Sequence, residues 1–235
     1  MTFFSQILDL VIPRQCIQCK SLSRTGLCSR CLEMLPRHII LTLPHKPQAS
    51  YLFKYNSPQI SETRTHNSPH LKAVVSLTPF RDKRIRQLIH RFKYLNITSL
   101  SYPLSRILLL NLSHLLQNSQ SFAICPIPLH PKREKLRGYN QSHLLVEHLS
   151  QDLNVPIIHD LIRTRHTQPQ MSFPHPDERR KNIAQAFACP RKSPDIPNTV
   201  LLVDDVTTTL STLSEAASAL HIAGFTDIYA ITIAR

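Results

Sequence analysis

Hydrophobic positions from residue 72 onward follow two alternating spacings, and each spacing predicts a different element. Short apolar runs bounded by polar residues and proline predict strands at residues 72–80, 122–128, 155–164, 199–205 and 227–234. Apolar residues three and four positions apart predict helices at residues 84–94, 102–118 and 139–153, with a short helix or an ordered loop at 176–187. This alternation predicts an α/β fold with a parallel sheet flanked by helices.

Local signals complete the prediction at both ends of this region. Thr212 and Glu215 have the spacing of a capping box that opens a last helix, and Gly224 fits a left-handed cap at its end. The apolar residues of the first 11 positions have helical spacing and predict a short helix. Residues 41–72 are rich in Pro, Ser, Asn and His without a period, which predicts a linker or a loosely packed connection. The expected organisation is a module at 1–40, this connection, and a larger domain at 73–235.

Composition adds a strong charge imbalance. Among 235 residues, Lys and Arg number 28 and Asp and Glu 15, which gives a formal net charge of +13. This excess favours polyanionic partners such as nucleic acid, phosphorylated small molecules or an anionic membrane surface, although an inert basic surface would have the same composition. No apolar stretch is long enough for a membrane span, and the amino-terminal segment lacks the basic start and cleavage site of a secretory signal. We therefore expect a cytoplasmic protein with no membrane span.

Four cysteines near the amino terminus form the array CxxC-x8-CxxC, at Cys16, Cys19, Cys28 and Cys31. Two such pairs supply four thiolates to one tetrahedral metal ion and leave no open position, which predicts a structural zinc site. The alternative is a pair of redox-active or incidental CxxC motifs in a reducing compartment. Cys125 and Cys189 are isolated, so core packing is their default role.

The stretch VDDVTTTLST, residues 203–212, combines two carboxylates with a run of hydroxyls. Asp204 and Asp205 follow an apolar strand, and ligands of open parallel sheets bind beyond the carboxyl ends of strands. Adjacent carboxylates accept hydrogen bonds from ribose hydroxyls or hold a hydrated Mg2+, while loop amides and a helix start favour a phosphate. The alternative is an Asp-Asp turn with threonine as an ordinary helix cap.

Several blocks taken in order resemble the ComF family of bacterial competence-associated proteins, which have a zinc finger and a type I phosphoribosyltransferase-like domain. The blocks are IHRFKY (89–94), CPIPLHPKREKLRGYNQS (125–142), TQPQ (167–170), ERRKN (178–182) and VDDVTTT (203–209). The resemblance includes the four-cysteine module and covers nearly the whole chain apart from residues 41–72.

This resemblance implies a site for phosphoribosyl pyrophosphate (PRPP) with Mg2+. Asp204 and Asp205 match the pair that binds ribose or Mg2+. The residues on the pyrophosphate side are Leu129, His130, Lys132, Arg133 and Arg137. The loop that wraps the 5-phosphate, usually TTGxT, corresponds to Thr207, Thr208, Thr209, Leu210, Ser211 and Thr212.

Leu210 occupies the position of the glycine in that loop. A leucine in a left-handed conformation costs about 1–2 kcal/mol, and its side chain would crowd the anion. We therefore expect a retained fold with weakened or altered PRPP binding, and a gain in PRPP affinity from Leu210→Gly.

The resemblance also implies handling of single-stranded DNA during natural transformation. The DNA-binding candidates come from three basic clusters: Arg84, Arg86, Arg91, Lys93, Lys135, Arg179 and Arg180. Tyr94 and Tyr139 are candidates for stacking on bases, while Phe92 fits the core better. Two alternatives stay open at this point. One is a phosphoribosyltransferase acting on an unknown base, against which Leu210 argues, and the other is an adaptor whose zinc module docks on a helicase or pore component of DNA uptake.

Overall fold

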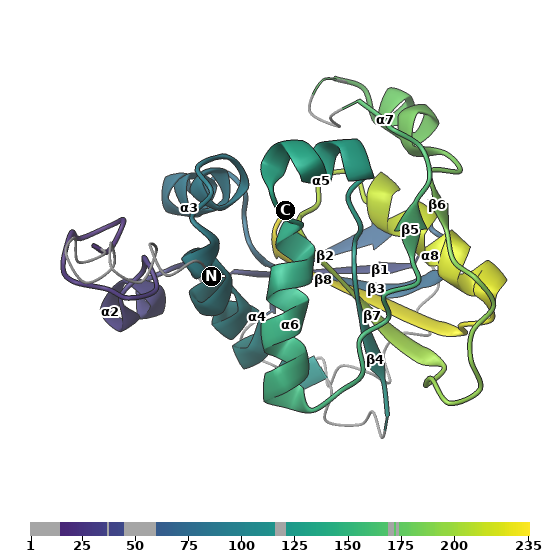
Figure 1. The fold of residues 1–235 in the computed structure, drawn as a ribbon, viewed down its shortest axis with the longest axis horizontal. Coiled ribbons are helices and arrows are strands. Elements are labelled where there is room, and N and C mark those ends of the chain that lie inside the picture. The colour runs from purple at the N-terminus through teal and green to yellow at the C-terminus, as the bar shows by residue number, and fades with distance from the viewer. Residues whose placement is uncertain (1–14, 37, 45–59, 116–120, 169–171, 173) are drawn as a thin grey trace.

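A six-stranded mixed sheet forms the centre of the protein (Figure 1). The structure is a computed structural model that describes residues 15–36, 38–44, 60–115, 121–168, 172 and 174–235. The strands lie in the order β2-β1-β3-β8-β7-β4 and are β1 (Ile39–Pro44), β2 (Ile60–His66), β3 (Leu71–Thr78), β4 (Ala123–Pro126), β7 (Thr199–Val206) and β8 (Asp227–Ala234). The α/β class is confirmed. Neighbouring strands are parallel, as expected, except that β1 and β3 are antiparallel.

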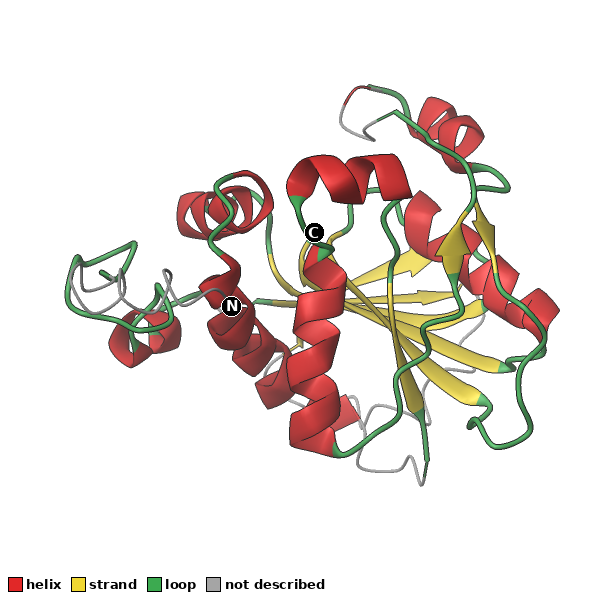
Figure 2. Ribbon diagram, viewed as in Figure 1, coloured by secondary structure: helices red, strands yellow, loops and turns green. Residues whose placement is uncertain are grey.

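Side chains of the central strands alternate between two apolar cores, because successive residues of a strand point to opposite faces. On β7, Leu201 and Val203 belong to one core, whereas Val200 and Leu202 belong to the other. Helices α4 (Ser101–Leu115) and α6 (Gln141–Leu153) cover the first face, and α8 (Ser211–Ala223) covers the second (Figure 2). Covering both faces accounts for the nearly continuous apolar sequence of β7.

Three further helices lie at the edge of the sheet where the parallel strands end (Figure 1). They are α3 (Lys83–Tyr94), α5 (Pro131–Arg137) and α7 (Pro176–Ile183). Helix α3 buries Ile85, Leu88, Ile89 and Phe92, which confirms the predicted amphipathic helix. The Asp82 side chain caps α3 by accepting hydrogen bonds from the backbone N–H groups of Arg84 and Ile85.

The amino-terminal cysteine module packs on the same core as α3. It contains the short helix α2 (Ser29–Glu33), and Leu27 and Leu35 belong to one apolar cluster with Ile85 and Leu88. The Arg84 guanidinium also donates a hydrogen bond to the carbonyl of Met34, at 3.0 Å. The predicted helix within the first 11 residues lies outside the described residues.

Edge strands correct the prediction of a linker at residues 41–72. Its described parts include most of β1 and all of β2, which pair in parallel at the edge of the sheet. β2 has the polar sequence ISETRTH. Main-chain pairing, which hydropathy does not report, therefore contributes much of the stability of this strand. The middle of the predicted linker lies outside the described residues.

Three other local predictions also change. Within residues 155–164, only β5 (Ile162–Arg163) is a strand, paired antiparallel with β6 (Phe187–Ala188), and Ile157 adds a single bridge to Ile124. Residues 131–137, for which the hydrophobic spacing predicts no helix, form α5, because His130 caps it and Pro131 occupies its first turn. The capping box is wrong, because the N-cap of α8 is Leu210, two residues before Thr212, and the Glu215 carboxylate instead accepts from the backbone N–H of Gln185 at 2.9 Å. Gly224 does cap α8, with φ of 109°.

Candidate functional site

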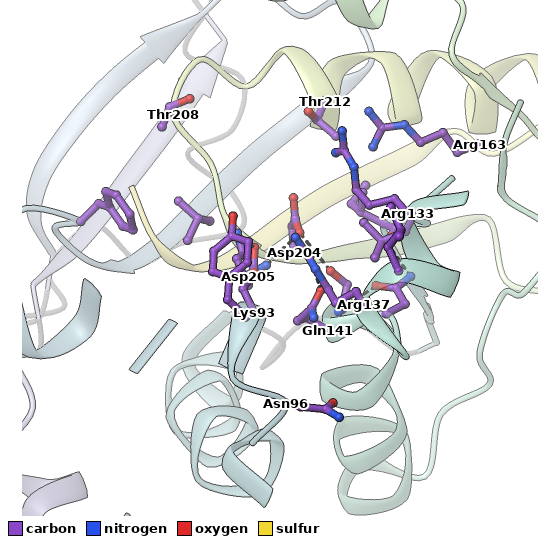
Figure 3. A pocket seen from close by; sticks show the side chains of 18 of the residues that line it. Lys93, Asn96, Arg133, Arg137, Gln141, Arg163, Asp204, Asp205, Thr208 and Thr212 are labelled. Carbon is purple, nitrogen blue, oxygen red and sulfur yellow. Dashed lines mark hydrogen bonds and ion pairs between the residues drawn. The ribbon is translucent and has the colours of Figure 1, made fainter. Parts of the chain in front are cut away.

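A cavity of about 770 Å³ opens at the carboxyl ends of β4 and β7, where the α/β fold predicts a ligand site (Figure 3). Residues of α3, α5 and α7 line it together with the loops that follow the two strands. Asp204 and Asp205 lie at its floor, and Arg133, Arg137 and Arg163 lie across from them (Figure 3). The cavity, called here the acid–arginine pocket, therefore brings carboxylates and guanidinium groups to one place.

The two carboxylates on its floor are held by different partners. Asp204 Oδ1 accepts hydrogen bonds from the Ser142 hydroxyl and from the backbone N–H of Asp205, both at 2.9 Å. Asp205 is only 4% exposed and its Oδ1 pairs with the Lys93 ammonium at 2.9 Å. Burial, together with the charge of Asp205, raises the pKa of Asp204 to about 7. Asp205 Oδ2 is buried and has no hydrogen-bond partner among the described residues, so it is available to a ribose hydroxyl or a hydrated cation.

The opposite wall contains a buried arginine that no carboxylate of the described residues contacts directly, while the charge of Asp204 acts on it from farther away. Arg163 is 7% exposed, and no carboxylate of the described residues forms an ion pair with it. Its guanidinium donates to the Thr167 hydroxyl, while its Nε has no partner in the described part of the chain. Burial, and then the nearby charge of Arg133, lower the pKa of Arg163 to about 10. Because a buried charge is costly unless it is paired, this arrangement favours an anionic ligand.

Neighbouring side chains fix the rest of this wall. Arg133 donates to the carbonyl of Thr167 at 2.8 Å, so Thr167 holds both arginines. Arg137 donates to Gln141 Oε1 at 2.6 Å, and its guanidinium lies 5.3 Å from the centre of the Tyr94 ring. Asn140 caps α6 by accepting from the backbone N–H of Ser142, and its amide donates to the carbonyl of Ile127.

The predicted phosphate loop lies between this pocket and the second apolar core. Thr208 and Thr212 line the pocket, and Arg179 donates to the Thr208 hydroxyl at 3.1 Å. Leu210 has φ of 62° and ψ of 0°, which confirms the left-handed conformation. Its side chain is 4% exposed, belongs to the second core and does not line the pocket. The expected crowding of the pocket by Leu210 is therefore wrong, because burial turns the side chain inward.

The structure gathers about half of the predicted site residues around the pocket. These are Asp204, Asp205, Thr208, Thr212, Leu129, Arg133, Arg137, Lys93 and Arg179. Within the rest of the predicted loop, Thr207 is buried, whereas Thr209, Leu210 and Ser211 line a separate cavity of about 470 Å³. His130 does not line the pocket either, since its Nδ1 caps α5 by accepting from the backbone N–H of Lys132.

The remaining DNA-binding candidates lie on the outer sides of the same helices. Arg86 and Arg91 are on α3, and Lys135 is exposed on α5. Lys132, which was predicted on the pyrophosphate side, is also exposed on α5 and does not line the pocket. Arg84 is engaged by Asp82 and Met34, and Arg180 pairs with Asp177 at 3.4 Å on an exposed surface.

Sequence reasoning missed Arg163 and Asn96 as pocket residues, and Ser142 as the partner of Asp204. An arginine directly after the apolar pair Leu161-Ile162 was the only signal for Arg163.

A second candidate site is the cysteine cluster. The sulfur atoms of Cys16, Cys19, Cys28 and Cys31 all lie within 4.8 Å of one another. Hydrogen bonds from Ser21 lower the pKa of Cys19 to about 6, while burial raises that of Cys31 to about 12. Four thiol groups this close fit a single metal ion, which would hold all of them as thiolates. The cluster can therefore bind a metal ion such as zinc.

Together these features define an α/β protein with a four-cysteine metal-binding module and an acid–arginine pocket at the carboxyl edge of its sheet. Among the described residues, no helix is both long and apolar enough to cross a membrane.

Comparison with known proteins extends this classification. Competence protein F of Haemophilus influenzae is 31% identical over 229 residues, which covers 94% of this chain and 96% of that protein. DNA utilization protein YhgH of Escherichia coli O157:H7 is 29% identical over 228 residues, or 90% and 92% of the two chains. Competence protein ComFC of Bacillus subtilis is 31% identical over 99 residues, or 42% and 38%. No family model matches the chain. On the similarity to competence protein F, the chain belongs to the ComF family.

Proposed function

We propose that this protein acts in DNA uptake during natural transformation, where it handles single-stranded DNA and binds PRPP with Mg2+ in the acid–arginine pocket. The names of two similar proteins, competence protein F and DNA utilization protein YhgH, support the broader role. The observation that carries the pocket's ligand class is Arg163, which is 7% exposed and has no carboxylate partner among the described residues. A phosphate or pyrophosphate group supplies the missing negative charge.

PRPP matches the pocket at both walls. Its ribose hydroxyls are donors for the carboxylates, and Asp205 Oδ2 is buried without a partner in the described residues. Its pyrophosphate is an acceptor for Arg133 and Arg163, which share Thr167 as a support. Mg2+ would be held through its water shell by Asp204 and Asp205 and would neutralise part of the pyrophosphate charge. The raised pKa of Asp204 supports this assignment, because a cation stabilises the ionised pair.

DNA binding is supported by the placement of the basic clusters. The three clusters fall on α3, α5 and α7 (Figure 1). Each of these helices contributes residues to the lining of the acid–arginine pocket. Arg86, Arg91 and Lys135 have no side-chain hydrogen bond or ion pair with another described residue, so they are available to phosphates. Phosphate contacts of this kind dominate the affinity for nucleic acid and make it depend on salt.

The experiment that tests this proposal measures binding of a fluorescent single-stranded oligonucleotide at several salt concentrations. We expect the wild-type affinity to fall steeply with salt, and Arg86→Gln to weaken binding and to reduce the salt slope by about 0.7. Lys72→Gln is the matched control, because Lys72 pairs with Asp227 at the amino-terminal ends of β3 and β8, away from the pocket. Equal effects of the two variants would contradict a binding face on α3.

Phosphoribosyl transfer is the second candidate function, and Leu210 is the observation that favours keeping it. Since this side chain is buried away from the pocket, it does not block the ligand. Release of pyrophosphate from PRPP that depends on an added base would show phosphoribosyltransferase activity. Binding of PRPP without release of pyrophosphate would show that the pocket is a ligand site only. Zinc in the cysteine cluster completes the proposal, since four sulfur ligands match its structural sites.

A further inference from the structure

A second cavity of about 700 Å³ lies along α3, beside the acid–arginine pocket. One side of the helix lines it with four cations, Lys83, Arg86, Arg91 and Lys93, and with the rings of His90 and Tyr94. Its described lining contains no aspartate or glutamate. This α3 groove is therefore a concave surface with positive charges only. Such a surface focuses a positive electrostatic potential, which attracts anions.

The rings in the groove select the class of anion. Tyr94 is 59% exposed, and its ring centre lies 5.1 Å from that of His90 at an angle of 46°. Phe92, by contrast, is fully buried, and the Tyr139 hydroxyl donates to the carbonyl of Phe92. Cations that alternate with an exposed aromatic ring fit the phosphates and unpaired bases of a single strand, because a duplex keeps its bases stacked.

The α3 groove and the acid–arginine pocket share a wall formed by Phe80, Lys93 and Tyr94. Within this wall, the Lys93 ammonium pairs with Asp205 at 2.9 Å, and the two side chains are 22% and 5% exposed. The side chain of lysine is a flexible stem with a point charge at its end, so a small rotation carries that charge from one cavity to the other. Lys93 is therefore placed to serve either cavity.

We propose that the α3 groove binds the phosphate backbone of single-stranded DNA and that Lys93 couples this groove to the acid–arginine pocket. When the pocket is empty, Asp205 neutralises Lys93. Bound PRPP with Mg2+ would compete with Lys93 for Asp205, and the ammonium that loses this partner would turn to a DNA phosphate. DNA binding is then tighter in the loaded protein, and by linkage PRPP binds more tightly in the presence of DNA. This inference rests on the proposed function of the pocket.

The test measures the affinity of the full chain for a labelled oligothymidylate, with and without PRPP and Mg2+, across salt concentrations. For the wild type we expect PRPP with Mg2+ to tighten binding by about five-fold. We also expect the slope of log K against log salt to steepen by about 0.7, which corresponds to one more phosphate contact.

Two variants test the role of the ion pair, and the test of Asp205→Asn needs no PRPP. Asp205→Asn keeps the size of the side chain but removes the charge that pairs with Lys93. In the absence of PRPP, we therefore expect this variant to bind DNA with the affinity that the wild type has in the presence of PRPP and Mg2+. Lys93→Gln should bind DNA more weakly, and PRPP should no longer change its affinity. Lys135→Gln, exposed on α5, is the control that lowers DNA affinity in both states and preserves the response to PRPP. Circular dichroism verifies that each variant is folded.

The outcomes separate the inference from the proposed function. If the wild type binds both ligands with independent affinities, the coupling is wrong and the proposed function stands. If PRPP does not bind, the proposed pocket ligand is wrong, and Asp205→Asn still decides the role of Lys93: unchanged DNA affinity in this variant overturns the coupling. If no oligonucleotide binds, both proposals fail.

Discussion

Replacing the buried arginine of the acid–arginine pocket separates its cost to folding from its use in ligand binding. The pKa of Arg163 falls from 12.5 to about 10 on burial, and at about 1.4 kcal/mol per pKa unit the buried charge destabilises the fold by about 3 kcal/mol. Methionine has a similar volume and no charge. Arg163→Met loses the hydrogen bond to Thr167, which contributes about 1.5–3 kcal/mol. We therefore expect the empty variant to be as stable as the wild type or about 1 kcal/mol more stable.

Ligand binding should reverse this order. A ligand that binds only the folded state stabilises it by about 2.7 kcal/mol at one hundred times its dissociation constant. Pyrophosphate or PRPP with Mg2+ should accordingly raise the denaturation midpoint of the wild type and leave that of Arg163→Met unchanged. Urea unfolding followed by circular dichroism measures both effects. A variant that is more than about 2 kcal/mol less stable than the empty wild type would refute the idea that Arg163 is an unpaired buried charge.

Three other perturbations have expected outcomes. Leu210→Gly and Leu210→Ala should each lower the free energy of unfolding by about 2–5 kcal/mol, with Gly above Ala by about 0.5–1 kcal/mol because it relieves the left-handed strain. If urea titrations give Leu210→Ala a higher free energy of unfolding than Leu210→Gly, the strain at Leu210 is refuted. A higher PRPP affinity of Leu210→Gly would instead show that the Leu210 side chain crowds the ligand. The pKa of Asp204 rises from 3.8 to about 7 on folding, so its contribution to stability is present below pH 4 and is lost as pH rises through 7. Asp204→Asn should therefore lose less stability than the wild type between pH 5 and 8, and identical pH profiles would contradict the shift. Chelation of the zinc proposed for the cysteine cluster, or Cys28→Ser, should expose the amino-terminal module to proteolysis, because metal binding and folding are coupled in so small a module. Unchanged digestion after chelation would argue for incidental cysteines.

Elements with strong periodic signals were predictable from the sequence. The apolar run of β7 and the amphipathic pattern of α3 depend on local residues, and both elements form where expected. The edge strand β2 was not predictable in this way, since its polar sequence is stabilised by main-chain pairing with β1. The start of α8 was predicted too late in the chain, because Leu210 and not Thr212 precedes the helix. The free energy gained by burying the Leu210 side chain in the core outweighs the cost of its left-handed backbone.

The candidate site likewise contains residues with a local sequence signal and residues that only the tertiary structure brings together. Asp204 and Asp205 were predictable, because a carboxylate pair at the end of an apolar strand is a local signal. The pairing of Lys93 with Asp205 joins residues that are far apart in the sequence and depends on how α3 packs beside β7. Arg163 carries no motif, and only its burial without a carboxylate partner among the described residues marks it as part of the pocket.

Titration calorimetry of PRPP with Mg2+ into the full chain tests the proposed pocket ligand most directly. We predict saturable binding at one site per chain, lost in Arg163→Met and retained in Lys135→Gln, which changes an exposed cation outside the pocket. Absence of binding heat over a range of temperatures, or equal binding by the wild type and Arg163→Met, would contradict a PRPP site at the acid–arginine pocket.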